Sequence, residues 1–220
     1  MENRFDIYDL LTALIPGSVV LFCVYILFRD VLGNSGILDS ALKIFIFVIL
    51  AFIAGHILIA VKSTSLWKDL AEGRDRHPSR YVFMKGLGDS VLSKKLAQAI
   101  KNRLKYNQGL KTLSDEEAFT LAMKFSEVKP SAKLHKIYAL HDFYRVMIVA
   151  VTAVFIMFFI ALITGSYRSD LSIISKIPAL LVSFLFYVLC FGLFRSMARS
   201  RAIYWVREVL LSADRALSSK

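Results

Sequence analysis

The chain has 220 residues, 56% of them apolar, and a formal net charge of +11. Globular proteins are about 45–50% apolar, so a composition this apolar, gathered in long uninterrupted runs, excludes an ordinary water-soluble domain. The two cysteines, Cys23 and Cys190, both lie inside apolar runs. We expect them to pack as small apolar residues, with no disulfide and no cysteine-based metal site.

Four apolar stretches approach the roughly 20 residues that a helix needs to cross about 30 Å of hydrocarbon. They are Leu10–Phe28, Ile44–Val61, Val146–Thr164 and Ile177–Phe194. A helix at the surface of a soluble protein has a polar face, and these stretches have none. The sequence therefore predicts an all-α integral membrane protein built on a four-helix transmembrane bundle.

The placement of Lys and Arg predicts the orientation of these spans. Residues 62–145 hold 17 basic side chains, whereas the short segments 29–43 and 167–176 hold two each. Segments that remain in the cytoplasm are enriched in Lys and Arg. We therefore expect the middle segment (64–143) to be a helical cytoplasmic insertion between spans 2 and 3, and both chain termini to be cytoplasmic.

This orientation divides the chain into four parts. The expected parts are an interfacial N-terminal segment with the first transmembrane hairpin (1–63), the basic helical segment (64–143), the second transmembrane hairpin (144–196) and a C-terminal cytoplasmic helix (197–220).

Small and polar residues mark the first hairpin. Pro16 removes a backbone hydrogen bond beside Gly17, which predicts a kink in the first span or the end of a short interfacial helix. Ala51 and Gly55 form a small-x-x-x-small pattern, which lets two helices pack closely. His56 follows inside the second span, where a polar group is costly, and is a candidate gating residue.

The middle segment predicts three helices. Apolar residues four positions apart predict a helix over 89–106, and Gly109 lies where its C-terminal cap would fall. Ser114 and Glu117 have the spacing of a capping box that opens a second helix. A third helix is expected to begin near Ser131 and to continue into the third span.

The helix over 89–106 is basic on the face opposite its apolar stripe. The basic residues of that face are Lys94, Lys95, Lys101, Arg103 and Lys105. A basic amphipathic helix is typical of a surface that meets anionic lipid or a partner, and each basic residue near an anionic leaflet contributes about 1 kcal/mol. Nucleic acid is a less favoured ligand, because Tyr106 stands nearly alone as a ring for base stacking.

The fourth span carries Ser183, Tyr187 and Cys190 on one helical face. These side chains suit either interhelical hydrogen bonds or the lining of a constriction. Secondary transport is disfavoured because the spans lack acidic residues and show no repeated halves. Any conduction would need a homo-oligomer with a shared axis.

No motif points to catalysis or to a metal. The segment 86–90 has two glycines before a helix, but it lacks the third glycine of a dinucleotide-binding turn and the Gly-Lys-Ser/Thr of a P-loop. None of the four histidines belongs to a His-Glu-x-x-His motif, and no Gly-x-Ser-x-Gly nucleophile elbow is present. We expect no enzymatic activity, no cofactor and no metal ion.

Three stretches resemble one group of proteins. They are Phe5–Leu11 with the following Pro16-Gly17, Phe52–His56, and the closing Arg-rich helix with Arg201, Tyr204, Val206 and Arg207. The group comprises small four-span bacterial membrane proteins, some of which accompany anti-phage defence genes, and the membrane subunit of the Kiwa system is one candidate relative. The resemblance implies a location in the bacterial inner membrane and a role in defence.

Two functions are compatible with these features. In the first, an oligomeric effector is triggered through its cytoplasmic helices and then perturbs or depolarises the membrane. In the alternative, the spans only anchor an oligomer, and the basic cytoplasmic platform recruits a soluble effector that itself binds nucleic acid. The expected partners are the lipid bilayer, further copies of the chain and a soluble cytoplasmic protein.

Overall fold

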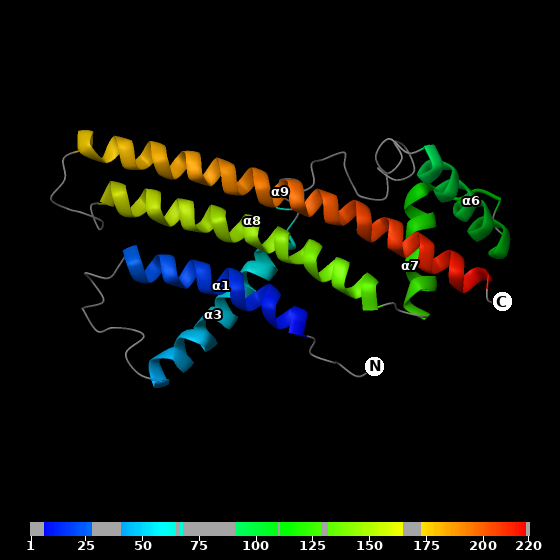
Figure 1. The fold of residues 1–220 in the computed structure, drawn as a ribbon, viewed down its shortest axis with the longest axis horizontal. Coiled ribbons are helices and arrows are strands. Elements are labelled where there is room, and N and C mark those ends of the chain that lie inside the picture. Colours follow the sequence, from blue (N-terminus) through cyan, green and yellow to red (C-terminus); the bar gives the residue numbers. More distant parts are fainter. Residues whose placement is uncertain are drawn as a thin grey trace. The chain divides into compact units, whose positions relative to one another are not determined.

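The computed structural model describes residues 7–27, 41–64, 67, 91–109, 111–128, 132–164 and 173–218 (Figure 1). Within these residues the chain forms helices and turns but no strand, which confirms the prediction of an all-α protein. The helices are α1 (Ile7–Leu27), α3 (Ala41–Lys62), α6 (Val91–Asn107), α7 (Asp115–Val128), α8 (Ala132–Thr164) and α9 (Ile173–Ser218).

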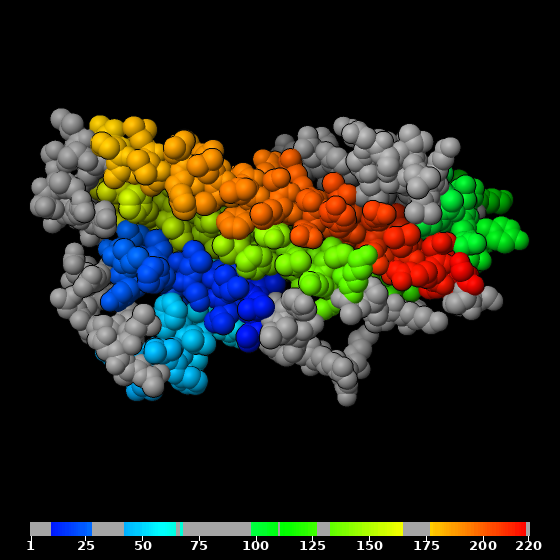
Figure 2. Space-filling view, in the orientation of Figure 1, coloured from blue at the N-terminus to red at the C-terminus, as the bar shows by residue number. Residues whose placement is uncertain are grey.

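Four of these helices, α1, α3, α8 and α9, are long and apolar enough to cross a membrane. Many of their apolar side chains are exposed; Phe186 of α9, for example, is 67% exposed. The apolar segment of α9, yellow to orange in Figure 2, lies on the visible surface. Exposed aliphatic and aromatic side chains are stable in lipid, so this surface fits a membrane-spanning helix.

The chain divides into two compact units. Unit 1 comprises residues 1–68 and 142–196, and unit 2 comprises residues 69–141 and 197–220. The sequence places its boundaries at 63/64, 143/144 and 196/197. The two units also divide at 196/197, but the helical backbone is continuous there, because α9 is one helix of 46 residues. No Gly or Pro follows Gly192 in α9 to interrupt it.

In unit 1, α1 and α3 cross at small residues (Figure 1). Ala13 and Ala51 are fully buried at this crossing. A Cβ atom added to Gly17 would collide with the Ala51 carbonyl oxygen, and one added to Gly55 would collide with the Ala13 carbonyl oxygen. Two small-x-x-x-small patterns therefore face each other, so the helix backbones are in direct contact.

Pro16 lies inside α1 and is fully buried. No helix ends there, so the interfacial alternative, a short helix that stops at this proline, is wrong. The helix continues because burial against neighbouring helices holds a proline-containing segment that an isolated helix would disfavour.

The C-terminal end of α3 is joined to α8 by an ion pair. Lys62 Nζ bonds Asp142 Oδ1, and Lys62 is only 8% exposed. Around this pair, Leu58 of α3 packs with Val146 and Val149 of α8 in the core of unit 1. The aliphatic contacts and the ion pair together fix α3 against α8.

Unit 2 has a separate core contributed by three helices. Its buried members include Ile100 and Leu104 from α6, Ala118 and Phe119 from α7, and Val206, Val209 and Ala213 from α9. The helices predicted over 89–106 and from Ser114 are confirmed as α6 and α7, and the predicted long helix from Ser131 is confirmed as α8.

Candidate functional site

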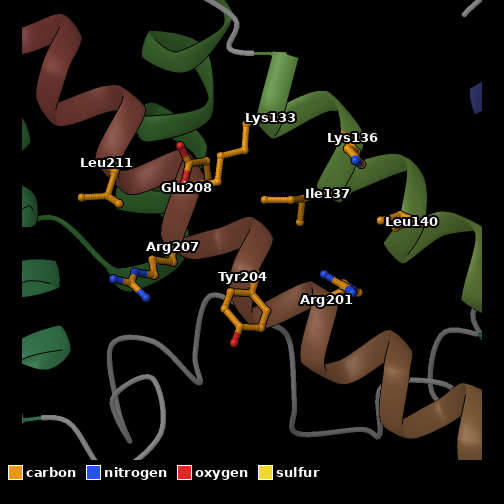
Figure 3. Close-up of a pocket in the computed structure, with 9 residues that line it drawn as sticks. All are labelled: Lys133, Lys136, Ile137, Leu140, Arg201, Tyr204, Arg207, Glu208 and Leu211. Carbon is orange, nitrogen blue, oxygen red and sulfur yellow. Dashed lines mark hydrogen bonds and ion pairs between the residues drawn. The ribbon is translucent and has the colours of Figure 1, made fainter.

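A pocket of about 360 Å³ lies in unit 2 between α8 and α9 (Figure 3). Four basic residues line it, and they are Lys133, Lys136, Arg201 and Arg207. The remaining lining residues are Ile137, Leu140, Tyr204, Glu208 and Leu211. The pocket thus combines a basic rim with aliphatic and aromatic surface.

Helical spacing places these residues along one face of each helix. On α8, Lys133, Ile137 and Leu140 are separated by four and three positions, and on α9, Tyr204, Glu208 and Leu211 follow the same spacing. Residues three or four apart lie on the same side of a helix. The pocket forms where these two faces meet.

Glu208 is the acidic residue of the pocket, and its charge is already paired. Its side chain is 8% exposed and lies 3.0 Å from both Lys133 Nζ and Arg215 Nη2. Figure 3 shows Lys133 reaching across from α8 to this carboxylate. Two cations neutralise one buried carboxylate, which removes the cost of burying it alone.

The other three cations of the pocket have no such partner in the described part of the chain. Among the described residues, no carboxylate forms an ion pair with Lys136, Arg201 or Arg207. Lys136 and Arg207 are exposed, and Arg201 is half-buried. Three like charges around one hollow create a positive potential that favours an anionic ligand.

An aromatic cluster beside the pocket holds α8 and α9 together. Trp205 of α9 packs against Tyr138 at 5.4 Å and against the buried His141 at 6.2 Å, both between ring centroids. The imidazole Nδ1–H of His141 donates to the Ala198 carbonyl, 3.0 Å away. These contacts fix the spacing of the two helices that form the pocket.

The predicted basic face of α6 is partly engaged within unit 2. Lys101 pairs with Asp115 at 2.5 Å, and Arg103 pairs with Asp214 at 2.6 Å. Lys105 is half-buried. The side chains of Lys94 and Lys95 lie outside the described residues. Two of the five predicted surface cations therefore hold α6 to α7 and to α9.

The predicted gating residues do not form one cluster. Ser183 Oγ donates to the Leu180 carbonyl of its own helix at 2.9 Å. The Tyr187 hydroxyl lies 3.4 Å from Thr152 Oγ1 on α8. His56 is exposed on α3. No contact among the described residues joins His56 to Ser183 or to Tyr187.

Tyr187 and His56 each contact an aromatic ring. The ring of Tyr187 stacks on Phe155 of α8 at 4.6 Å, and the imidazole of His56 meets the edge of Phe52 at 4.3 Å, both between ring centroids. These contacts are those of packing residues, and they leave His56 on the outer surface of α3.

Sequence reasoning did not single out the pocket. Its signal was present as Lys133 and Lys136 on one helix and Arg201 and Arg207 on the other. Helical periodicity shows which residues share a face, but it does not show which two faces meet. The segment 86–90, whose two glycines precede a helix, lies outside the described residues, and within the described residues no cluster suited to a metal ion occurs.

Comparisons with protein-family models, with curated proteins and with solved structures give no match for this chain. Function therefore has to be argued from the site itself, because an all-helical fold supports many activities.

Proposed function

We propose that this protein is a membrane-anchored docking protein of the bacterial inner membrane that recruits a soluble acidic partner in an anti-phage defence system. The four apolar helices anchor it. Unit 2 lies on the cytoplasmic side and presents the binding surface. The observation that carries this proposal is the pocket whose Lys136, Arg201 and Arg207 lack acidic partners among the described residues.

The packing of unit 2 supports a binding role. Its core joins α6, α7 and α9, and cross-helix ion pairs such as Arg103–Asp214 reinforce it. A helical unit with its own core can hold surface charges in fixed positions. Fixed positive charges accelerate the approach of an acidic partner and select against basic ones.

The contacts of the spans support the anchoring role. Ser183 bonds its own helix, and Tyr187 is held by Thr152 and Phe155. An interhelical hydrogen bond such as that between Tyr187 and Thr152 stabilises helix packing by about 0.6 kcal/mol. These packing contacts account for both polar side chains without requiring a path through the membrane.

Charge reversal at the mouth of the pocket tests the proposal. The wild-type chain, the Lys136→Glu/Arg207→Glu variant and the matched exposed control Lys124→Glu are expressed at equal membrane abundance in the host. Each is crosslinked in cells and purified in an uncharged detergent, and the associated proteins are quantified by mass spectrometry.

A partner of low isoelectric point is expected with the wild type and with Lys124→Glu, and in samples purified without crosslinking its recovery should fall with rising salt. It should be lost from the Lys136→Glu/Arg207→Glu variant. Identical associated proteins in all three samples would show that unit 2 does not recruit through this pocket.

A second candidate function, membrane depolarisation by a homo-oligomer, is favoured by one observation. His56 lies on the exposed surface of α3 within a span. A polar group there is costly in lipid unless another protein surface or water meets it. A second copy of the chain would supply that surface.

Membrane potential measured with a voltage-sensitive dye during phage challenge tests this second function. Cells with the wild type should depolarise, cells with His56→Leu should not, and cells with the neighbouring control Ile53→Leu should behave as wild type. A stable potential in protected wild-type cells would eliminate depolarisation as the mechanism.

A further inference from the structure

The pocket of unit 2 has two chemically distinct parts. Its basic part is formed by Lys136, Arg201 and Arg207, which no described carboxylate neutralises. Its apolar part is formed by the aliphatic side chains of Ile137, Leu140 and Leu211. A ligand that satisfies both parts needs an anionic group and an apolar group.

Arg201 and Lys136 specify the anionic group. Lys133 and Arg215 already occupy the Glu208 carboxylate, so this acid does not compete for them. A guanidinium presents planar paired N–H donors that match the oxygens of a phosphate. Arg207 is six positions from Arg201 on α9, so its side chain leaves the helix about 120° away, and Figure 3 shows it on the other side of Tyr204 from Arg201 and Lys136. Arg207 therefore adds to the positive potential of the pocket without meeting the same phosphate.

The aliphatic side chains and the size of the pocket specify the rest of the ligand. Small-molecule pockets commonly measure about 300–1,000 Å³ and are mainly apolar with a few placed polar groups. A volume of about 360 Å³ is at the lower end of that range. It fits a headgroup with the first part of an attached chain, or a small phosphorylated ring. Inorganic phosphate would leave the apolar side chains without a contact.

We infer that this pocket binds a phosphate ester that carries an apolar body, with the phosphate at Arg201 and Lys136 and the body against Ile137, Leu140 and Leu211. Two sources supply such a ligand: an anionic phospholipid and a soluble nucleotide. The inference goes beyond the recruitment of a protein partner, because the pocket binds this ligand whether or not a partner is present.

The position of Arg201 along α9 favours phospholipid as the source. Arg201 follows the apolar stretch that ends at Phe194 by seven residues of the same helix. Seven helical residues rise about 10 Å, slightly beyond the polar layer of about 5–8 Å on each side of the hydrocarbon. Helical side chains lean toward the N-terminal end of the helix, which brings the Arg201 guanidinium back toward that layer.

Binding is measured on the full chain in dodecyl maltoside, an uncharged detergent. The signals are the fluorescence of Trp205 in a Trp67→Phe background and ligand-bound masses in native mass spectrometry. The chain has two tryptophans, and Trp205 contacts Tyr138 and His141 beside the pocket. The probes are dihexanoyl phosphatidylglycerol, dihexanoyl phosphatidylcholine, adenosine monophosphate and inorganic phosphate.

Saturable binding of phosphatidylglycerol in preference to phosphatidylcholine and phosphate supports the inference with the membrane as source. Preferential binding of adenosine monophosphate supports it with a soluble source. If phosphatidylcholine binds as well as phosphatidylglycerol, the pocket does not recognise the net negative charge, and the inference is overturned. Inorganic phosphate that binds as well as either ester overturns the role of the apolar side chains, and no saturable binding overturns the whole inference.

The Lys136→Gln/Arg201→Gln variant should weaken the preferred ligand by about tenfold or more, which is at least one decade in Kd. The matched control Lys124→Gln, exposed on α7, should bind as wild type. Unchanged affinity in the Lys136→Gln/Arg201→Gln variant would overturn the assignment. If that variant does not purify as a folded protein, Lys136→Gln alone is used, because this side chain is exposed and its replacement removes one charge without disturbing the core.

These measurements use purified protein and no partner. Ligand binding with unchanged partner recovery in the charge-reversal experiment would leave this inference standing and remove the proposed function. Partner recruitment without ligand binding would leave the proposed function standing and remove this inference.

Discussion

Gly17 and Gly55 lie where the backbones of α1 and α3 approach most closely. A Cβ atom at either position would collide with a carbonyl oxygen of the opposite helix, and backbone atoms cannot yield as a flexible side chain can. We expect Gly17→Ala and Gly55→Ala each to destabilise unit 1 by about 1–3 kcal/mol, the usual cost of overpacking. Thermal unfolding in detergent measures the effect.

Gly192 of α9 provides the control for these substitutions. It is also helical, but a Cβ atom there would meet nothing within 4 Å. Gly192→Ala should unfold at the wild-type temperature or slightly above it, because alanine favours helix. Equal melting temperatures for all three variants would contradict close α1–α3 packing.

Asp142 forms an ion pair with the buried Lys62, and its loss removes this carboxylate from the buried cation. Asp142→Ala should destabilise the protein by up to about 3–5 kcal/mol, because removing one partner of a buried ion pair weakens the compensation of the other charge. The double variant Lys62→Met/Asp142→Leu should recover most of the loss. A double variant as unstable as Asp142→Ala would show that packing around Asp142, and not its charge, decides stability.

Part of this packing could be predicted from residue patterns in the sequence. Ala51 and Gly55 were recognisable because two small residues four positions apart in an apolar helix indicate close approach. The matching pattern of Ala13 with Gly17 was not recognised, because Pro16 between them suggested a kink or a helix end. The Lys62–Asp142 pair joins residues 80 positions apart, and no local pattern predicts such a contact.

Among the elements, the start of α7 could be predicted from a local sequence signal alone, the capping box. The Ser114 amide donates to Glu117 Oε2 at 2.8 Å, and the Glu117 amide donates to Ser114 Oγ at 3.3 Å, which confirms the predicted capping box. Ser114→Ala should destabilise unit 2 by about 1 kcal/mol. Chemical unfolding followed by helicity measures this, with the exposed Thr112→Ala just before the box as the control.

The same capping box predicts a pH dependence. The hydrogen bond from the Ser114 amide lowers the pKa of Glu117, because it favours the charged carboxylate. The stabilisation is therefore complete above the ordinary pKa of a glutamate, about 4.3, and is lost as pH falls through the lowered value. Unfolding measured from pH 6 to pH 3 should show this loss in the wild type. Glu117→Gln, which does not titrate, should lack this contribution.

Elements whose boundaries depend on distant contacts were harder to predict. The periodicity of α6 identified its apolar stripe but suggested that its cations all face outward. Lys101 and Arg103 instead meet carboxylates on α7 and α9. The C-terminal helix was predicted as a separate element because its polarity changes after Phe194, although the helical backbone of α9 continues unchanged.

For the whole molecule, orientation in the membrane is the property on which both proposed functions depend. The segment 62–145 carries 17 basic residues, and each of the segments 29–43 and 167–176 carries two. Translocation of so many Lys and Arg residues is disfavoured, so unit 2 should be cytoplasmic and both short segments periplasmic. A positive unit 2 would then face the cytosol and the anionic inner leaflet.

Single-cysteine labelling decides the orientation. In a Cys23→Ala/Cys190→Ala background, a membrane-impermeant maleimide should label Ser35→Cys in intact spheroplasts. It should label Ser218→Cys, at an exposed position of α9, only after the cells are permeabilised. The reverse pattern would place unit 2 outside the cytoplasm. A cytosolic partner and a cytoplasmic trigger would then both be impossible, whereas the phosphate-ester pocket would face the outer leaflet and could still bind lipid.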